Sequence, residues 1–263
     1  MTLKNIKVGS DPELFIVNTK TNKVVSSIGL IPGVKGEAYR SPEMPEGYGL
    51  QIDNILAEFN IPPTNKKEEF ITSMNYMKDY IRDYVKAKNP DLDILCTASM
   101  DVDEDQLQSE EAKEFGCMPD YNAYTEDINP KPEGNKTNMR SAGCHIHVSY
   151  DFPNANDSVL LVKYMDMYLG IPSVVLDPDT KRRNLYGKAG SFRLCKYGVE
   201  YRTLSSKFID NDEYITFMWN GITKAIHAFN RRLPIISAQT VQNVINNSDV
   251  TKAKELIETY NLM

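Results

Sequence analysis

Residues 9–17 read GSDPELFIV, and this stretch decides the fold. Successive side chains of a strand point to opposite faces, so Asp11 and Glu13 share one face, about 6.5 Å apart. Leu14 and Ile16 share the other face, which has the apolar character of a core. A strand with one acidic face and one apolar face predicts a sheet that packs on one side and carries polar chemistry on the other.

Three further segments repeat this pattern of two polar residues around one intervening residue. They are Glu58-Phe-Asn60, His145-Ile-His147 and Glu200-Tyr-Arg202. If the four strands share one sheet, one face collects carboxylates, imidazoles, an amide and a guanidinium. Two carboxylates about 4 Å apart repel by about 4 kcal/mol at an effective dielectric constant of about 20. Because cations remove that cost, we interpret the face as a site for divalent metal ions.

Each pair also has a simpler structural explanation. Asp11 and Glu13 taken alone are explained as solvated acids at a strand end, and Glu200 and Arg202 as a salt bridge. The His-x-His segment taken alone is explained as two structural imidazoles, although the chain has only 3 histidines. Glu58 lies in a strongly apolar segment, where a solvated acid is less common. The pairs together favour metal ligation.

The amino-acid composition and net charge argue against several classes of function. The chain has 263 residues, 41% hydrophobic and 25% charged, with a formal net charge of −6. This composition is typical of a globular protein, and the net charge argues against general binding to nucleic acid or anionic membranes. We expect no membrane-spanning run, no signal peptide and a cytoplasmic location. The spacing of Cys96, Cys117, Cys144 and Cys195 argues against a zinc knuckle and favours buried free thiols.

Cations concentrate shortly before the Glu200 segment. They are Arg182, Arg183, Lys188 and Arg193, followed by Arg202. Guanidinium groups bind phosphate through two parallel hydrogen bonds, so cations beside acids suggest a nucleoside triphosphate with its metal ions. Residues 187–191 contain Gly-Lys but lack the spacing of a phosphate-binding P-loop. A nucleotide-binding site in this chain would therefore have to be built from residues other than a P-loop.

The expected strands and helices, joined by long and varied connections, predict an α+β fold. A single domain over residues 1–263 is expected because the candidate ligands come from distant parts of the chain. Expected strands cover 4–18, 23–29, 49–61 in two parts around Asp53-Asn54, 92–102, 140–150 and parts of 181–205. Pro62-Pro63 is expected to stop its strand and Thr64 to cap a helix. Other expected helices cover 108–115, 155–170, 211–232, 236–246 and 249–260, with a long loop over 30–48.

Five segments together resemble a known family. They are GSDPELFIV, DNILAEFNIPP, SAGCHIHVS, RRNLYGKAGSFR and GVEYRTLSS. In this order they resemble the COOH–NH2 ligase-type amidoligases, many of them phage-encoded, of the glutamine synthetase and glutamate–cysteine ligase superfamily. The likeness runs from about residue 8 to residue 210. SAGCHIHVS is similar to the glutamine synthetase pattern NG-(S/A)-G-x-H-x-(H/N)-x-S, and VEYR to its E-x-R strand.

The resemblance implies a curved, largely antiparallel sheet of the glutamine synthetase type, with helices on its outer face and Mg²⁺ or Mn²⁺ ions on its concave face. The implied metal ligands are Asp11, Glu13, Glu58, His145 and Glu200. The implied contacts to ATP are His147, Arg182 or Arg183, Lys188, Arg193 and Arg202. Glu13, Glu58, Arg193, Glu200 and Arg202 are implied to take part in catalysis.

The implied activity is ATP-dependent joining of a carboxylate substrate and an amine substrate, such as an amino acid or peptide, through an acyl phosphate. The location would be the host cytoplasm for a phage-encoded member. The residues leave open a phosphagen-kinase-like phosphotransferase, a metal-dependent hydrolase that works without ATP, and a binding module without turnover. They also leave the oligomeric state open. The loop over residues 30–48 is expected to close over the acyl phosphate.

Overall fold

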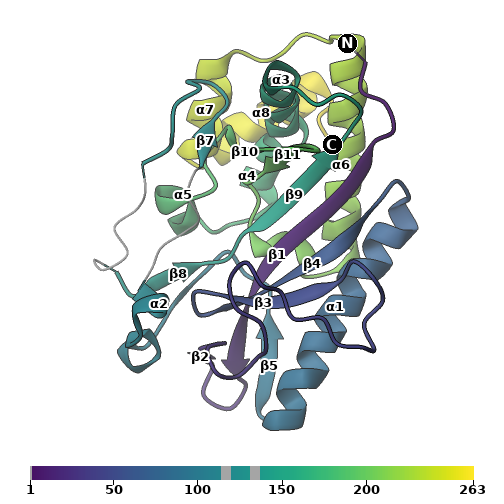
Figure 1. Cartoon of the computed structure of the whole chain (residues 1–263). Helices are drawn as coiled ribbons and strands as arrows, with labels where there is room; N and C mark the ends of the chain where they lie inside the picture. Colours follow the sequence, from purple (N-terminus) through teal and green to yellow (C-terminus); the bar gives the residue numbers. More distant parts are fainter. Residues whose placement is uncertain (1, 114–119, 131–136) are drawn as a thin grey trace.

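A computed structural model describes residues 2–113, 120–130 and 137–263. Its main feature is an open sheet, built around the long strand β1 (Figure 1). The spatial order is β3 (Gly49–Asp53), β4 (Leu56–Thr64), β1 (Lys7–Asn18), β9 (Cys144–Ser149), β11 (Gly198–Tyr201), β10 (Ser191–Cys195) and β7 (Tyr121–Asn122). Short strands β2 (Lys23–Val25) and β5 (Leu92–Leu95) pair with the end of β1. Neighbouring strands in the described residues run antiparallel, which confirms the mixed fold with a large antiparallel sheet.

The longer helices pack against the apolar face of this sheet. α1 (Lys67–Lys88) covers β4 and β5, while α3 (Ala155–Met165) contacts β10, β11 and α6 (Asp212–Arg231). α3 continues through a π-helical turn (Asp166–Gly170) into α4 (Ile171–Leu176), on which α7 (Ala238–Asn246) and α8 (Val250–Tyr260) pack. The Asn211 side chain caps α6 by accepting from the Tyr214 N–H, and it thereby satisfies one of the free donors of the first turn.

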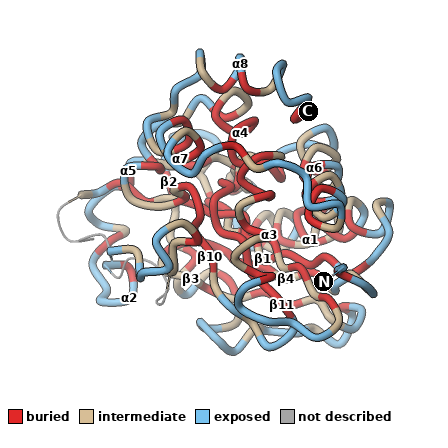
Figure 2. Tube along the Cα trace, turned by 90° about the horizontal axis from the view of Figure 1, so that it is seen from above, coloured by how far each residue is buried: buried red, intermediate tan, exposed pale blue. Residues whose placement is uncertain are grey.

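The predicted division of β1 into two faces is present. Leu14 and Ile16 are fully buried in the main core, together with Ile146 of β9 and Val199 of β11. On the opposite face, Phe15 belongs to a smaller apolar cluster with Val24, Ile55, Leu56, Val102, Leu107, Ala112 and Ala142. The buried strands cross the middle of the molecule in Figure 2. The smaller cluster closes one end of the polar face, so polar side chains are confined to the rest of it.

Two expectations about the end of β4 are wrong. The strand continues through Pro62-Pro63 to Thr64, at a position where its register with β1 shifts between Val8 and Ser10. A shifted register leaves some backbone groups outside the regular ladder, so proline is tolerated there. Thr64 does not cap α1, because the cap residue is Lys66 and the Thr64 hydroxyl accepts from the Lys66 N–H in the preceding turn.

Other predicted elements are divided. The strand expected over 92–102 becomes β5 and β6 (Ser99–Asp101), and β6 pairs with β8 (Met139–Ser141) in a separate two-stranded sheet. The strand expected over 140–150 becomes β8 and β9, separated at Gly143. The segment 181–205 begins with a helix, α5 (Lys181–Leu185), and not with a strand. The remaining short elements are η1 (Glu104–Leu107), α2 (Glu110–Lys113) and η4 (Ser206–Ile209). The expected end of a helix at 114–115 lies outside the described residues.

The helix expected over 155–170 extends to Leu176. By length and composition, the run Ala155–Leu176 is the one helix in the described residues that would suffice to cross a membrane, contrary to the expectation of no such run. Its most apolar window is 67% buried inside the fold. That burial is the pattern of a core helix, and Asp166 in its π-helical turn is fully buried.

Candidate functional site

The four polar pairs lie on four adjacent strands of the sheet, in the order β4, β1, β9 and β11. Glu13 stands directly opposite Glu58, and Asp11 stands opposite His145. His147 in turn stands opposite Glu200. Directly paired residues of neighbouring strands project from the same face. Strands from distant parts of the sequence thus bring the acids and both imidazoles together on one wall.

Asp11, His145 and Glu200 form the centre of this wall. His145 Nδ1 lies 3.4 Å from Asp11 Oδ1 and 3.7 Å from Glu200 Oε1, and one ligand atom from each residue falls within 4.8 Å of the others. Ligand atoms about 2.1 Å from a shared ion stand about 3.0–3.4 Å apart. The three residues therefore fit a divalent ion after small movements, and their oxygen and imidazole donors suit Mg²⁺ or Mn²⁺.

Glu13 and Glu58 add two more carboxylates. Burial, reinforced by the negative charges of Asp11, Asp53 and Glu13, raises the pKa of Glu58 well above its ordinary value. Burial also raises the pKa of Glu13, whose Oε2 accepts from the Gly143 N–H at 2.6 Å. Gln51 Nε2 donates to Glu58 Oε2 at 2.8 Å. Carboxylates crowded in this way need either protons or nearby cations, which again fits a metal site.

His147 is held by an ion pair. Its Nε2 lies 2.8 Å from Asp11 Oδ1, and its Nδ1 contacts the Tyr197 hydroxyl. Burial raises the pKa of Asp11 and lowers that of His147, but their mutual attraction outweighs burial. The pKa of Asp11 therefore lies below its usual range and that of His147 well above. The pair carries its two charges in the folded protein.

Glu200 connects this set to the arginines. The carboxylate is 2% exposed and pairs with Arg202, which directly follows β11, and with Arg193 Nη1, 3.0 Å away on β10. Arg202 Nε also lies 3.4 Å from Asp120 Oδ1. Burial lowers the pKa of Arg202, but the negative charges of Glu200 and Asp120 raise it above its ordinary value. The salt bridge that the simpler explanation predicted between Glu200 and Arg202 is present. Glu200 also belongs to the group formed with Asp11 and His145 that fits a divalent ion.

Arg182 and Arg183 point in different directions. Arg182 lines a cavity beside Glu13, where Nη1 donates to the Thr203 carbonyl at 2.8 Å and burial lowers its pKa to about 10. Arg183 Nη2 instead donates to Ser173 Oγ at 3.0 Å, within the helical layer. Lys188 and Arg183 are not among the described residues that line this cavity. Of the two neighbouring arginines, only Arg182 reaches it.

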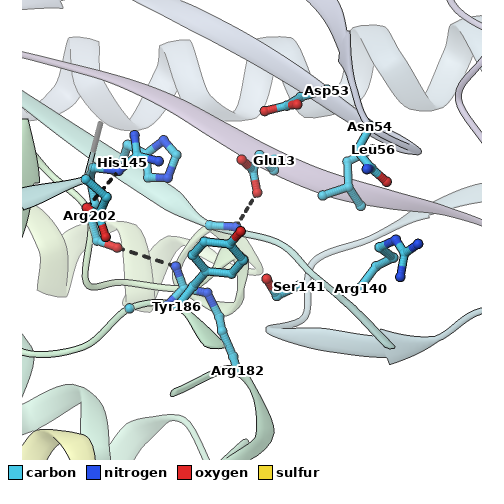
Figure 3. Close-up of a pocket in the computed structure, with 13 residues that line it drawn as sticks. Glu13, Asp53, Asn54, Leu56, Arg140, Ser141, His145, Arg182, Tyr186 and Arg202 are labelled. Carbon is cyan, nitrogen blue, oxygen red and sulfur yellow. Dashed lines mark hydrogen bonds and ion pairs between the residues drawn. The ribbon is translucent and has the colours of Figure 1, made fainter. Parts of the chain in front are cut away.

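The cavity contains about 600 Å³ of atom-free space, part of it open to solvent (Figure 3). Besides Glu13, His145, Arg182 and Arg202, its lining includes residues that the sequence analysis did not select. These are Asp53, Asn54, Leu56, Asp120, Arg140, Ser141, Gly143, Tyr186 and Gly187. Asp53 lies where the sequence predicted a break between two strands, and it is the last residue of β3. Ser141 and Gly143 lie at alternate positions before His145 in the strand expected over 140–150, so the period of two could have found them. Asp120 and Tyr186 lie outside strands and helices, where no local pattern marks the direction of a side chain.

A second cavity lies at the other end of the wall. Its lining includes Asp11, His147, Tyr197, Ile61 and Pro63. Glu13, two residues after Asp11 on β1, and His145, two residues before His147 on the antiparallel strand β9, line the first cavity instead. The group formed by Asp11, His145 and Glu200 consequently lies between the two cavities.

The predicted burial of the cysteines holds only in part. Cys96 and Cys144 are buried free thiols, whereas Cys195 is half-buried. Cys195 offers a ligand atom within 4.8 Å of atoms from His147 and Glu200. Cys117 lies outside the described residues.

Comparison with known proteins gives one family match. A family model described as phage phiEco32-like COOH.NH2 ligase-type 2 matches residues 126–246, which include His145, Arg182 and Glu200. This confirms the family resemblance over that part of the chain and is consistent with the wider superfamily. Asp11, Glu13 and Glu58 come from strands before the matched region. A search of curated proteins found no match to the chain.

Proposed function

We propose that this chain is an ATP-dependent carboxylate–amine ligase that forms an amide bond through an acyl phosphate. The observation that supports it most is the shared wall on which the Asp11, His145 and Glu200 group meets Arg193 and Arg202. The matched family, whose description names carboxyl and amine groups, favours this reaction over phosphate transfer to a guanidine.

Asp11, His145 and Glu200 would hold Mg²⁺ or Mn²⁺, with Glu13 and Glu58 beside them. Bound there, such ions neutralise phosphate charge and the negative charge that develops during phosphoryl transfer. The crowded carboxylates are the feature of this chain that supports the assignment, because without cations the charged forms of Glu13 and Glu58 are disfavoured.

In the first step, a substrate carboxylate oxygen attacks the γ-phosphorus and the bond from that phosphorus to the ADP oxygen breaks. We assign the orientation of the phosphoryl group to Arg193 and Arg202, which their pairing with Glu200 holds in place. Arg182 borders the cavity beside Glu13 and is assigned to the oxygens of the acyl phosphate. Arg183 and Lys188 are assigned no contact with substrate.

In the second step, the amine nitrogen attacks the acyl carbon, the carbon–oxygen bond to phosphate breaks and the nitrogen gives up a proton. Glu13 lines the cavity, and we assign its carboxylate, kept charged by the cations beside it, as the acceptor of that proton. The loop over residues 30–48 lies next to this region, since Lys35 Nζ pairs with Asp53 Oδ1 at 2.6 Å. We assign to this loop the exclusion of water from the acyl phosphate.

The two cavities suggest how the substrates divide. The second cavity, with Tyr197, Ile61 and Pro63, offers apolar surface suited to a nucleotide base near His147. The first cavity, with Arg182 and Arg202, offers charged groups suited to the carboxylate and amine substrates. Phosphates placed between them would lie at the Asp11, His145 and Glu200 group.

Three wider assignments accompany this proposal. The open antiparallel sheet with its helix-covered face is proposed to be a catalytic domain of the glutamine synthetase type. Residues 1–263 are proposed to act as one domain, since β1 and β11 both contribute to the wall. The location is proposed to be cytoplasmic.

The test uses the full chain with Mg²⁺, ATP, a pool of amino acids and short peptides, and a pool of amines that includes ammonia and polyamines. We expect phosphate release that requires an amine, together with a condensation product detected by mass spectrometry. Glu200→Gln should abolish the release, and Glu68→Gln at an exposed position of α1 should not. No amine-dependent release from any pool would contradict the proposal. ADP with a stable phosphorylated product would indicate a phosphotransferase, and turnover without ATP a hydrolase.

A further inference from the structure

We propose that His147, Cys195 and Glu200 form a second metal position, suited to a borderline-soft divalent ion such as Zn²⁺. It shares Glu200 with the Asp11 and His145 group and differs from it in ligand chemistry. The inference goes beyond the proposed ligase activity and does not depend on it, since it concerns the binding of an ion in the absence of nucleotide.

The sheet itself brings the three ligands together. His147 on β9 stands opposite Glu200 on β11, and Arg193 on β10 stands opposite Glu200 from the other side. Cys195 follows Arg193 by two positions and so shares its face. One ligand atom from each of His147, Cys195 and Glu200 lies within 4.8 Å of the other two.

The residue opposite Cys195 on β11 leaves space above the sheet. That residue is Gly198, which has no side chain on the wall. It is also fixed as glycine, because its φ of 149° is rarely adopted by other residues and an added Cβ would approach the Val148 carbonyl oxygen to 2.1 Å. Cys195 can therefore reach toward Glu200 without an intervening side chain.

The surroundings of His147 match a common arrangement of metal-binding histidines. Such a histidine usually donates its second ring N–H to a carboxylate, which fixes the ring and makes the other nitrogen a better ligand. Asp11 Oδ1, 2.8 Å from Nε2, supplies that carboxylate. Nδ1, which contacts the Tyr197 hydroxyl, is then the nitrogen that faces the ion, and Tyr197 must turn aside when the ion binds.

Ligand chemistry decides which ion binds. A thiolate is a preferred ligand of Zn²⁺ and a poor one for Mg²⁺, which prefers oxygen. A set of sulfur, nitrogen and oxygen therefore selects Zn²⁺ over Mg²⁺, and on binding both the Cys195 thiol proton and the Nδ1 proton of the charged His147 ring pass to solvent. Cys195 is accessible for this role because it is half-buried, whereas Cys96 and Cys144 are buried.

The first test uses the full, reduced chain without nucleotide and Co²⁺ as a spectroscopic substitute for Zn²⁺. We expect a near-ultraviolet charge-transfer band of the kind that a thiolate–cobalt bond produces. Cys195→Ser should remove the band and weaken Zn²⁺ binding, measured against a chromophoric chelator, at least tenfold. Cys96→Ala, a change at a buried thiol, should keep both. A missing band in the unaltered chain, or Zn²⁺ affinity unchanged in Cys195→Ser, would overturn the proposal.

A second measurement needs no variant. Alkylation of the unaltered chain, mapped by peptide mass spectrometry, should modify Cys195 and should slow at least tenfold when Zn²⁺ is present. Mg²⁺ at the same concentration should give no protection. Equal protection by the two ions, or none by Zn²⁺, would contradict the assignment of Cys195 as a ligand. Failure here leaves the ATP-dependent assay untouched, so the two proposals fail separately.

Discussion

Glu13 of β1 lies directly opposite Glu58 of β4, and burial raises the pKa of both carboxyl groups. Two buried acids in register weaken a sheet, since like charges on paired strands repel. The same arrangement is useful to a protein that binds cations on this wall. The cost to stability and the benefit to ion binding should therefore appear at the same residues.

Glu58→Gln should stabilise the metal-free protein near neutral pH. The folded-state pKa of Glu58 is raised, so its contribution to stability is lost as pH rises from the unfolded-state value through the folded-state value. Removing the charge should raise the free energy of unfolding by on the order of 1 kcal/mol or more, seen in urea titrations at neutral pH. The gain should shrink at acid pH and when Mg²⁺ is added. Glu68→Gln, at an exposed site, should change little, and a loss of stability in Glu58→Gln would contradict the electrostatic interpretation.

Substitution of Arg182 should mainly affect turnover, whereas substitution of its neighbour Arg183 should mainly affect stability. Arg182→Gln should lower ligase turnover at least tenfold, because the guanidinium borders the cavity. Arg183→Gln should mainly lower stability, by about 2–3 kcal/mol, because its bond to Ser173 lies inside the helical layer. Turnover per folded molecule and the urea midpoint, measured on both variants, separate the two effects. Equal losses of turnover would argue against the different positions of the two side chains.

The contrast between these arginines also shows what sequence reasoning could reach. The period of two in a strand predicted that Asp11 and Glu13 share a face, and the same rule worked for His145 and His147. The roles of Arg182 and Arg183 depended on the helix α5, which is too short to show a period. The pattern therefore assigned them to a strand or loop and could not choose between them.

Errors elsewhere came from contacts between distant residues. The strand expected over 140–150 is divided because β8 pairs with β6 in a separate sheet whereas β9 pairs with β1 and β11, and at the division the Gly143 N–H donates to Glu13 Oε2. Nothing near Gly143 in the sequence announces that partner. Asp53 at the end of β3, Asp120 just before β7 and Tyr186 just after α5 reach the cavity from the ends of elements, so only the folded chain shows that they belong to it.

Asp166 should control how stability depends on pH. It is fully buried in the π-helical turn and accepts from Tyr201 and Tyr124 hydroxyls and the Gly190 N–H, yet burial raises its pKa to about 7. Since the unfolded value is lower, its contribution to stability declines as pH rises from about 4 to about 8, by up to about 4 kcal/mol.

Asp166→Asn should flatten that part of the pH profile. Urea unfolding at several pH values checks it, with the difference between variant and unaltered chain as the readout. We expect the variant to be less stable at acid pH, where it loses a hydrogen-bond pattern, and to lose less on moving to pH 8. Parallel profiles for the two proteins would show that Asp166 does not titrate in this range.

Gly143→Ala tests whether the wall needs its present spacing. An added Cβ would lie 2.8 Å from His145 Nε2 and 3.3 Å from Arg182 Nη2, closer than such contacts normally allow. Both are side-chain ends, so the fold can survive by moving them away from the positions proposed for the metal ion and the acyl phosphate. We expect turnover to fall at least tenfold, because small displacements of positioned groups are costly to catalysis. Glu68→Gln, at an exposed position of α1 away from both cavities, is the control and should retain its stability and its turnover. Full activity in Gly143→Ala, with thermal unfolding unchanged, would show that neither His145 nor Arg182 must stay where the structure places it.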